Sequence, residues 1–222
     1  VIMVGDDPAS AIYVRNKEKA CEQVGFYSKC LKLSADISEE DLIGYIEELN
    51  KDENIDGILC QLPLPDGMNT KRVLSRINSD KDVDVFKSYN MGKILLGENS
   101  IAPCTPSGII ALLDEYNIDI KGKHCVIVGR SNIVGKPLSM LMLQRDATVT
   151  ISHSRTEGLK EICKTADILV SAVGCKDLIT VDMVKEGAVV IDVGINRDEN
   201  GKVCGDVSKD VIRSPSNWQE FL

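Results

Sequence analysis

Tyr13 and Lys17 lie four residues apart in the segment AIYVRNKEKA, so they share one face if this segment is a helix. A lysine on a face that turns toward a cleft loses solvation, which lowers its pKa and makes it usable as a general acid or base. The other interpretation is a solvated lysine on an amphipathic helix. Gln61 ends an apolar segment just before Pro63, so its amide is expected at the carboxyl end of a strand.

Two carboxylates follow in a segment of weak periodicity. Asp82 and Asp84 lie within residues 78–105, which are rich in Asp, Lys, Gly and Pro. Such composition is typical of loops, so this segment is predicted to be a connector.

A glycine turn marks the second half of the chain. A β-branched segment runs into Gly129, Gly135 follows six residues later, and a helical segment begins next. This layout is typical of a phosphate-binding turn, in which the helix N-terminus offers free N–H groups and a positive dipole to a pyrophosphate. The spacing is not GxGxxG, and a plain turn is the alternative.

The next strand bears on the choice of cofactor. In NAD-binding folds, a carboxylate near the end of the second strand binds the ribose 2′-hydroxyl. Here that strand is followed by Ser154 and Arg155, and the glycine turn adds Arg130. A hydroxyl and two cations suit a 2′-phosphate, which favours NADP over NAD; two solvated arginines are the other interpretation.

Alternating strand-like and helical segments predict the α/β class with a mostly parallel sheet and two lobes. The predicted strands are 1–4, 27–33, 57–62, 125–128, 148–151, 168–172 and 188–193. The predicted helices are 8–24 with Asp7 as N-cap, one beginning near Ser38, and 70–77, 107–116, 136–143, 159–165 and 181–186.

Composition narrows the function classes. Asp and Glu total 34 against 26 Lys and Arg, and a net charge of -8 argues against nucleic acid as a partner. No apolar run suits a membrane span and no signal peptide is evident, so we expect a cytoplasmic protein without a membrane partner. Eight cysteines without a CxxC pair and two histidines predict no metal site and reduced, mostly buried thiols.

Taken in order along the chain, several motifs resemble the bifunctional methylenetetrahydrofolate dehydrogenase/cyclohydrolase (FolD) family. The matching motifs are VGDDPAS at 4–10, YVRNK at 13–17, GILCQLPLP at 57–65, KDVD at 81–84, APCTPSG at 102–108, GRSNIVGKP at 129–137, ATVTISHS at 147–154 and GAVVIDVGINR at 187–197.

The resemblance implies a folate-binding catalytic domain at 1–100 and a Rossmann-like NADP-binding domain at 101–222. It further implies NADP-dependent oxidation of 5,10-methylenetetrahydrofolate to the 5,10-methenyl form and hydrolysis of that product to 10-formyltetrahydrofolate. These are reactions of one-carbon metabolism, which serves purine, methionine and histidine biosynthesis. Tetrahydrofolate derivatives would be the ligands, and a homodimer the assembly.

The resemblance also implies roles for individual residues. Lys17 would be the general acid/base, Tyr13 would stack on or orient the folate, Gln61 would tune Lys17, and Asp84 would bind the pterin. The residues implied in NADP binding are Gly129, Arg130, Ser131, Ser154 and Ile195.

Three departures from the family pattern are visible. Val85 stands where the family has glycine after KDVD, and β-branched residues are strained if the backbone there needs a positive φ. From about residue 208 the sequence SKDVIRSPSNWQEFL replaces the family's glycine- and proline-rich loop and closing helix, and the family's first helix is absent. Three hypotheses are left open. The chain is an incomplete or mis-translated family enzyme, a dehydrogenase of another substrate, or an impaired module that retains NADP binding or dimerisation.

Overall fold

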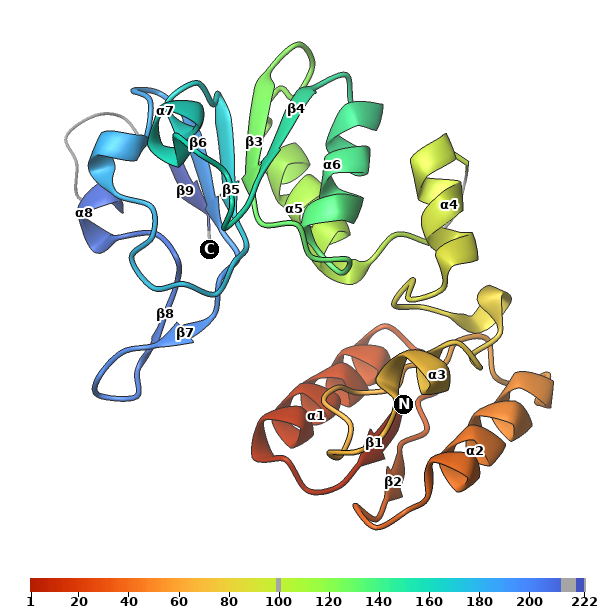
Figure 1. The fold of residues 1–222 in the computed structure, drawn as a ribbon. Coiled ribbons are helices and arrows are strands. Elements are labelled where there is room, and N and C mark those ends of the chain that lie inside the picture. Colours follow the sequence, from red (N-terminus) through yellow and green to blue (C-terminus); the bar gives the residue numbers. More distant parts are fainter. Residues whose placement is uncertain (99–100, 213–218, 222) are drawn as a thin grey trace. The chain divides into compact units, whose positions relative to one another are not determined.

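The computed structural model describes residues 1–98, 101–212 and 219–221. The chain divides into two compact units, Val1–Gly92 and Lys93–Leu222 (Figure 1). Helices and parallel strands alternate in both, so the predicted α/β class with two lobes is confirmed.

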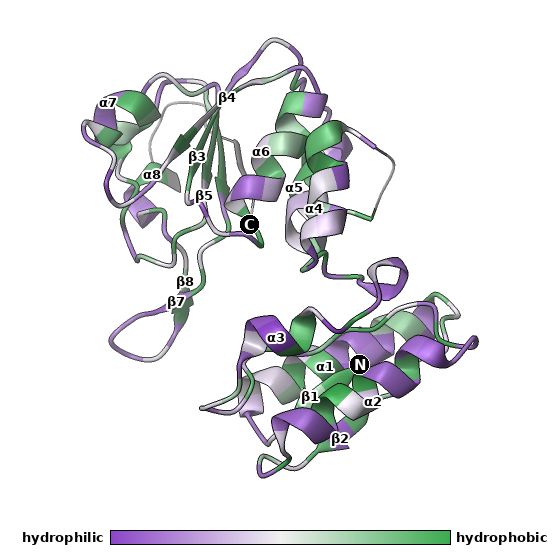
Figure 2. Cartoon of the chain, turned by 45° about the vertical axis from the view of Figure 1, so that its right-hand side comes forward, coloured by the Kyte–Doolittle hydropathy of each residue, from purple (hydrophilic) through white to green (hydrophobic). Residues whose placement is uncertain are grey.

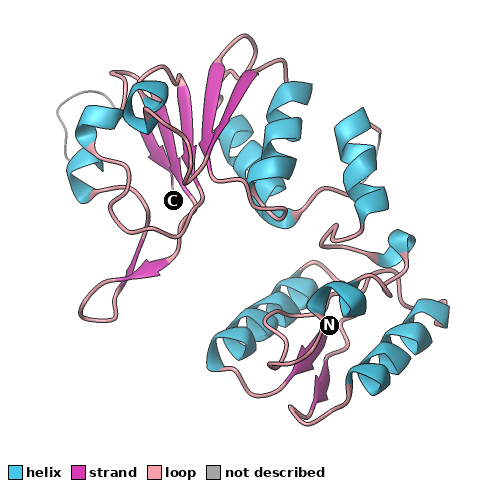
Figure 3. Cartoon of the chain, in the orientation of Figure 1, coloured by secondary structure: helices cyan, strands magenta, loops and turns pink. Residues whose placement is uncertain are grey.

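The first unit pairs two short parallel strands with helices (Figure 3). In β1 and β2, Ile2 lies opposite Leu31. The elements are β1 (Ile2–Val4), α1 (Pro8–Gln23), β2 (Leu31–Leu33), α2 (Glu39–Lys51), α3 (Thr70–Leu74) and the 3-10 helix η1 (Ser79–Lys81), and α4 (Ser88–Leu96) continues into the second unit.

Local capping explains where the first two helices begin. The Asp7 side chain accepts a hydrogen bond from the Ser10 N–H at 2.7 Å, and Pro8 opens α1. The Ser38 hydroxyl accepts from the Asp41 N–H at 3.1 Å and begins α2. Both predicted helix starts are confirmed.

Two predicted strands are shorter or less regular than expected. Residues 27–30 are not part of β2, which begins at Leu31. Residues 57–62 form no regular strand, although Cys60 bridges to Ile2 and the Gln61 N–H donates to the Ile2 carbonyl at 2.8 Å. The apolar side chains of this segment still contribute to the core, which explains the apolar pattern. The buried residues of this core are Ile2, Val4, Leu42, Ile43, Ile46, Ile58, Cys60, Leu64, Val73, Leu74 and Ile77.

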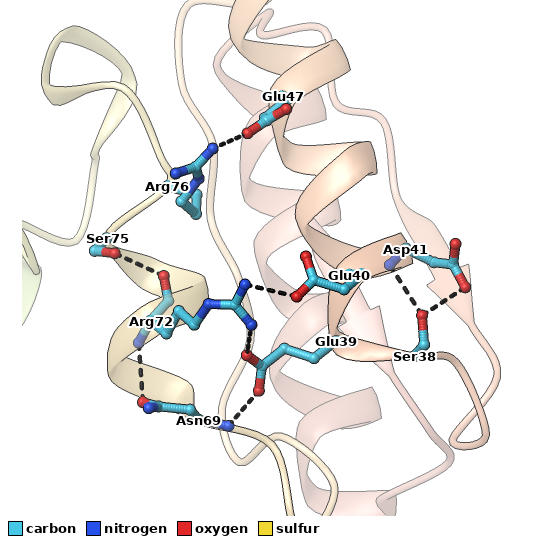
Figure 4. Close-up of polar contacts among 9 residues, drawn as sticks. All are labelled: Ser38, Glu39, Glu40, Asp41, Glu47, Asn69, Arg72, Ser75 and Arg76. Atoms are coloured by element: carbon cyan, nitrogen blue, oxygen red, sulfur yellow. Dashed lines mark hydrogen bonds and ion pairs between the residues drawn. The ribbon is translucent and has the colours of Figure 1, made fainter.

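Polar contacts on the surface join α2 to α3 (Figure 4). The Arg72 guanidinium contacts Glu39 at 2.5 Å and Glu40 at 2.6 Å, and Arg76 pairs with Glu47. These pairs are solvent-exposed, and such pairs contribute little to stability individually. The apolar core therefore dominates the packing of this unit.

The predicted connector at 78–105 is wrong in part, because η1, α4 and the start of α5 lie within it. The Asp82 carboxylate accepts hydrogen bonds from the N–H groups of Phe86 at 3.1 Å and Lys87 at 2.9 Å, just ahead of α4. It also accepts from the Asn90 side chain at 3.1 Å. A cap supplied from several residues upstream leaves no local start signal in the sequence, which explains why α4 was not expected.

The second unit contains a five-stranded parallel sheet in the order β4-β3-β5-β6-β9. This order matches a Rossmann-like sheet that lacks one edge strand. The elements are α5 (Cys104–Glu115), β3 (His124–Val128), α6 (Gly135–Gln144), β4 (Thr148–Ser152), α7 (Leu159–Cys163), β5 (Ile168–Ser171), the 3-10 helix η2 (Val181–Met183), β6 (Val189–Asp192), β7 (Asn196–Arg197), β8 (Val203–Cys204), α8 (Lys209–Ile212) and β9 (Gln219–Phe221).

Helices cover both faces of this sheet, with α5 and α6 on one side and α7 and α8 on the other (Figure 1). Side chains of β3 alternate between the two cores: Cys125 and Ile127 pack on the α5–α6 side, Val126 and Val128 on the opposite side. Figure 2 shows the central strands β3 and β5 as largely hydrophobic, as expected for strands buried on both faces.

No helix or strand was predicted after residue 193. Residues 219–221 nevertheless form β9, which pairs in parallel with β6 at the edge of the sheet. Residues 213–218 and 222 lie outside the described residues. The atypical sequence thus supplies an edge strand through backbone pairing, which needs no side-chain pattern.

All eight cysteines are free, as expected of reduced thiols. The expectation that most are buried is wrong, because only Cys60, Cys125 and Cys163 are, and Cys104 and Cys175 are exposed. Among the described helices, none combines the length and apolar character needed to cross a bilayer.

Val85 lies at φ 58 with its side chain only 2% exposed. This left-handed backbone is the strained case raised by the missing glycine, and it costs a non-glycine residue roughly 1–2 kcal/mol. Val85→Gly is therefore expected to be more stable than Val85→Ala by about 1 kcal/mol in urea unfolding, since both lose the buried methyl groups and only glycine relieves the backbone.

Val73, fully buried in helix α3, is the matched control. There the order is expected to reverse, with alanine more stable than glycine by about 1 kcal/mol. A glycine variant at 85 that is less stable than the alanine variant would show that this backbone is not strained.

Candidate active site

Lys17 and Gln61 come from distant segments and meet in the first unit. The Lys17 Nζ donates a hydrogen bond to Gln61 Oε1 at 3.3 Å, and Gln61 Nε2 donates to the Leu62 carbonyl at 2.8 Å. The second bond orients the amide so that its oxygen points at the ammonium. Lys17 is half-buried on α1.

The backbone fixes this pair in register. The Ile2 N–H donates to the Leu59 carbonyl at 2.7 Å, and the Ser10 hydroxyl of α1 donates to the Leu62 carbonyl at 3.3 Å. These bonds tie the segment that holds Gln61 to β1 on one side and to α1 on the other. Tyr13 lies one helical turn before Lys17 on the same face of α1 and is 50% exposed.

Asp84 interacts electrostatically with Lys17. Burial raises the pKa of the half-buried Asp84 carboxyl, the Lys17 charge lowers it in part, and the neighbouring Asp82 carboxylate adds to the increase. Burial, with a smaller contribution from Asp84, also raises the pKa of Cys60 to about 11, so this thiol is protonated at neutral pH. The structure therefore brings Lys17, Gln61 and Asp84 together.

Asp82 and Asp84, which the sequence does not distinguish, differ in role. Asp82 is 2% exposed and its carboxylate is occupied by backbone and side-chain donors at the start of α4. Asp84 is the more accessible of the two carboxylates. Asp82 thus anchors the turn, and Asp84 is the one available to a ligand.

In the second unit, Gly129 and Gly135 build the turn between β3 and α6. Gly129 has φ 131, and a Cβ there would lie 2.5 Å from the Ala172 carbonyl oxygen. A Cβ at Gly135 would lie 2.1 Å from the Gly129 carbonyl oxygen. Both glycines are required by close backbone approach, as expected of a turn that cradles a ligand.

The expected free N–H groups at the start of α6 are not found. The Ser131 hydroxyl accepts from the N–H groups of Val134 at 3.1 Å and Gly135 at 3.4 Å, and the Lys136 N–H donates to the Ser131 carbonyl at 3.1 Å. Pro137 has no N–H to offer. The turn therefore caps its own helix in this conformation, and the binding of a pyrophosphate by these groups stays a prediction.

Exposed polar side chains follow the ends of β3 and β4, which pair in parallel with Val128 opposite Ser152. Arg130 follows β3, and Ser154 and Arg155 follow β4; all three are exposed. The turn after β4 is closed by the His153 N–H donating to the Thr156 hydroxyl at 2.8 Å. These residues fit an anionic ligand at this edge of the sheet.

A further indication of a polar ligand lies nearby. The buried Ser152 hydroxyl has no hydrogen-bond partner among the described residues. On the other side of the sheet, Ile195 follows β6 and is 67% exposed. The glycine cradle, the exposed cations and this hydroxyl are compatible with a bound dinucleotide.

One group of residues in this unit was missed from the sequence. Asp192 and Asp206 are placed symmetrically in DVG at 192–194 and GDV at 205–207, and each accepts several hydrogen bonds at the end of β6. The mirrored motifs around a hairpin were the available signal.

Comparison with known proteins matches both units to one family. Residues 1–84 match the model described as the tetrahydrofolate dehydrogenase/cyclohydrolase catalytic domain. Residues 103–219 match the model of the NAD(P)-binding domain of the same family.

Individual relatives agree with this match. The chain is 54% identical over 218 residues to the bifunctional protein FolD of Bacillus cereus (strain G9842), covering 98% of this chain and 76% of the relative. The crystal structure of FolD from Campylobacter jejuni has a TM-score of 0.94 at 45% identity and covers 99% of this chain and 78% of that one. Trypanosoma brucei FolD, solved in complex with NADP and an inhibitor, has a TM-score of 0.91 at 35% identity, with 100% and 78% coverage.

The raised pKa of Asp84 predicts how the free energy of unfolding depends on pH. A carboxyl whose pKa is higher in the folded than in the unfolded state is destabilising once ionised, and this effect grows as pH rises from about 3.9 through the folded pKa. Asp84→Asn, which resembles the protonated form, is expected to unfold at higher urea concentration than wild type at pH 7. The difference should shrink as pH falls toward about 4.

Asp66→Asn, at an exposed position of the same unit, is the control and should show no such pH-dependent gain. An Asp84→Asn variant less stable than wild type at pH 7 would show that Asp84 stabilises the fold rather than serving a ligand.

Proposed function

Because the chain belongs to the tetrahydrofolate dehydrogenase/cyclohydrolase family, we propose that it oxidises 5,10-methylenetetrahydrofolate with NADP to the 5,10-methenyl form and hydrolyses that product to 10-formyltetrahydrofolate. The observation that carries this proposal is the contact of Lys17 with Gln61 beside Asp84 in the unit that matches the catalytic domain. Matches to both domains favour this enzyme over an impaired module that only binds NADP or dimerises.

The hydrolytic step needs a proton acceptor and an oriented substrate. The methenyl group is an electrophilic cation, so a water molecule that loses its proton to a nearby base can open it. Lys17 is the general acid/base in this proposal: as the amine it takes the proton of the attacking water, and as the ammonium it can return a proton. Gln61 holds the Lys17 Nζ in place through the 3.3 Å hydrogen bond. Asp84 binds the pterin, and Tyr13, on the same helix face as Lys17, stacks on or orients the folate.

The dinucleotide is held by the second unit in this proposal. Gly129 and Ser131 shape the turn, Arg130 and Ser154 meet the 2′-phosphate, and Ile195 contacts the cofactor from the end of β6. When bound, NADP supplies the hydride acceptor of the oxidation. Rigid placement of the ligands by these residues is the protein's main contribution to such a step.

The remaining parts of the proposal concern organisation. We assign folate binding to residues 1–100 and NADP binding to residues 101–222. We further propose a homodimer in the cytoplasm, with no nucleic-acid or membrane partner. The net charge of -8 supports the absence of a nucleic-acid partner.

Lys17→Gln tests the hydrolytic role. Loss of a general acid/base lowers turnover typically about 10²–10⁴-fold, so cyclohydrolase activity should fall by that order when the decay of methenyltetrahydrofolate absorbance is followed. NADP affinity, measured by titration, should be unchanged.

Lys19→Gln is the matched control, because Lys19 is exposed on the same helix. Unchanged cyclohydrolase turnover in Lys17→Gln would contradict the assignment of Lys17 as the general acid/base.

Arg130→Gln and Ser154→Ala test the choice of cofactor. Loss of a charge-assisted contact to the 2′-phosphate should raise the KM for NADP by about tenfold and leave the KM for NAD nearly unchanged. Lys121→Gln serves as the control, because Lys121 is an exposed cation that precedes β3, at the opposite end of the strand from Arg130. Equal increases in both KM values would contradict recognition of the 2′-phosphate by these residues.

A further inference from the structure

The Asp206 carboxylate is fully buried and collects hydrogen bonds from two separate segments. Its Oδ2 accepts from the Ser171 hydroxyl at 3.0 Å and from the N–H groups of Val173 at 2.9 Å and Gly174 at 3.3 Å. Its Oδ1 accepts from the Cys175 N–H at 2.7 Å and from Asn196 Nδ2 at 2.9 Å. Three successive N–H groups of the loop 173–175 therefore converge on one side chain.

Asp192 holds Asp206 in place in turn. The Asp192 carboxylate accepts from the N–H groups of Asp206 and Val207, both at 2.9 Å. The two carboxylates pass so close to the backbone that a Cβ at Gly194 would lie 1.9 Å from Asp206 Oδ1, and one at Gly205 would lie 1.8 Å from Asp192 Oδ2. Glycine at both positions is thus a condition for this arrangement.

The loop that Asp206 holds borders the glycine turn. The Ala172 N–H donates to the Val128 carbonyl at 2.8 Å, and the Ala172 oxygen lies 2.5 Å from the position of a Cβ at Gly129. A shift of residues 173–175 would therefore disturb the backbone at Gly129. Both segments lie at the carboxyl ends of neighbouring strands β3 and β5, where open α/β sheets bind ligands.

The strand order indicates which half of a dinucleotide this loop meets. In a Rossmann-like sheet the first two strands, here β3 and β4, hold the adenosine half, and binding extends across the point where the strand order reverses. That point lies here between β3 and β5. The loop after β5 is accordingly on the nicotinamide side.

The chemistry requires a carboxylate at this position. Burial alone would raise the pKa of Asp206, but the hydrogen bonds from Val173, Asn196, Cys175 and Ser171 together hold it below its usual value. An asparagine of the same shape would turn an NH₂ group toward backbone N–H donors, which cannot accept it.

We infer that Asp206 is a positioning residue that fixes the backbone of residues 173–175 for the nicotinamide half of NADP. This role rests on the proposed function, because it requires NADP as the ligand of the second unit. Asp206 itself does not contact the cofactor in this inference; it acts through the loop.

Asp206→Asn is compared with wild type by amide hydrogen exchange of the peptide 171–176, by NADP titration and by cyclohydrolase turnover. The amide exchange rate of the loop and the Kd for NADP should both rise about tenfold or more, since a charged hydrogen-bond acceptor is lost. Cyclohydrolase turnover should be retained, because its residues belong to the first unit. Asp198→Asn, which removes a carboxylate that accepts backbone N–H groups in the adjacent β7–β8 turn, should change none of the three.

Ser171→Ala keeps the carboxylate and removes one donor, so it decides the question if Asp206→Asn does not fold. It should shift loop exchange and the NADP Kd in the same direction by a smaller factor. Faster amide exchange in the loop with an unchanged Kd for NADP would overturn the inference. A raised Kd without faster exchange, or an equal loss of dehydrogenase and cyclohydrolase activity, would overturn it as well. Wild-type protein that binds NADP but lacks both activities would contradict the proposed function only, and the Kd comparison would still decide the role of Asp206.

Discussion

A buried carboxylate that accepts hydrogen bonds from consecutive backbone N–H groups holds the key loop in each unit of this protein. An ionised carboxylate removed from water is destabilising unless its oxygens are fully satisfied, and a charged acceptor forms stronger bonds than a neutral one. Asp82 and Asp206 meet this condition, with donors from the start of α4 and from residues 171–175. Loops that belong to no helix or strand ladder thereby acquire a defined shape, on which the neighbouring candidate site residues depend.

Asp84 illustrates the opposite arrangement two residues away from Asp82. Its carboxyl is half-buried with a raised pKa, and the backbone just after it is held in a left-handed conformation at Val85. Asp82 fixes the ends of this short turn through Phe86 and Lys87, so the strain is confined to the residues between. Destabilising features at Asp84 and Val85 thus lie next to the stabilising hydrogen bonds of Asp82, a pattern also expected of functional sites.

Local patterns in the sequence were sufficient for most of the fold. The caps at Asp7 and Ser38, the β-branched strands of the second unit and the approach of Gly135 to Gly129 depend on neighbours within a few residues. Part of what was missed depends on distant partners. Strand β9 is formed by pairing with β6, and the donors to Asp206 lie 10 to 35 residues away in the chain. Helix α4 was missed for another reason, because Asp82 accepts from N–H groups four and five residues later, a spacing outside the usual N-cap pattern. The contact of Lys17 with Gln61 spans 44 residues, and a family resemblance rather than spacing pointed to it.

The self-capped turn after β3 bears on which groups can interact with the phosphates of a dinucleotide. In many nucleotide-binding folds the N–H groups of a helix start receive the phosphates. Here the Ser131 hydroxyl and carbonyl engage the N–H groups at the start of α6. Exposed side chains add positive charge at this turn, with Arg130 after β3 and Arg155 after β4 as nearby cations. In a chain of net charge -8, these cations provide a local site of opposite sign, and their exposure makes its strength sensitive to screening by salt.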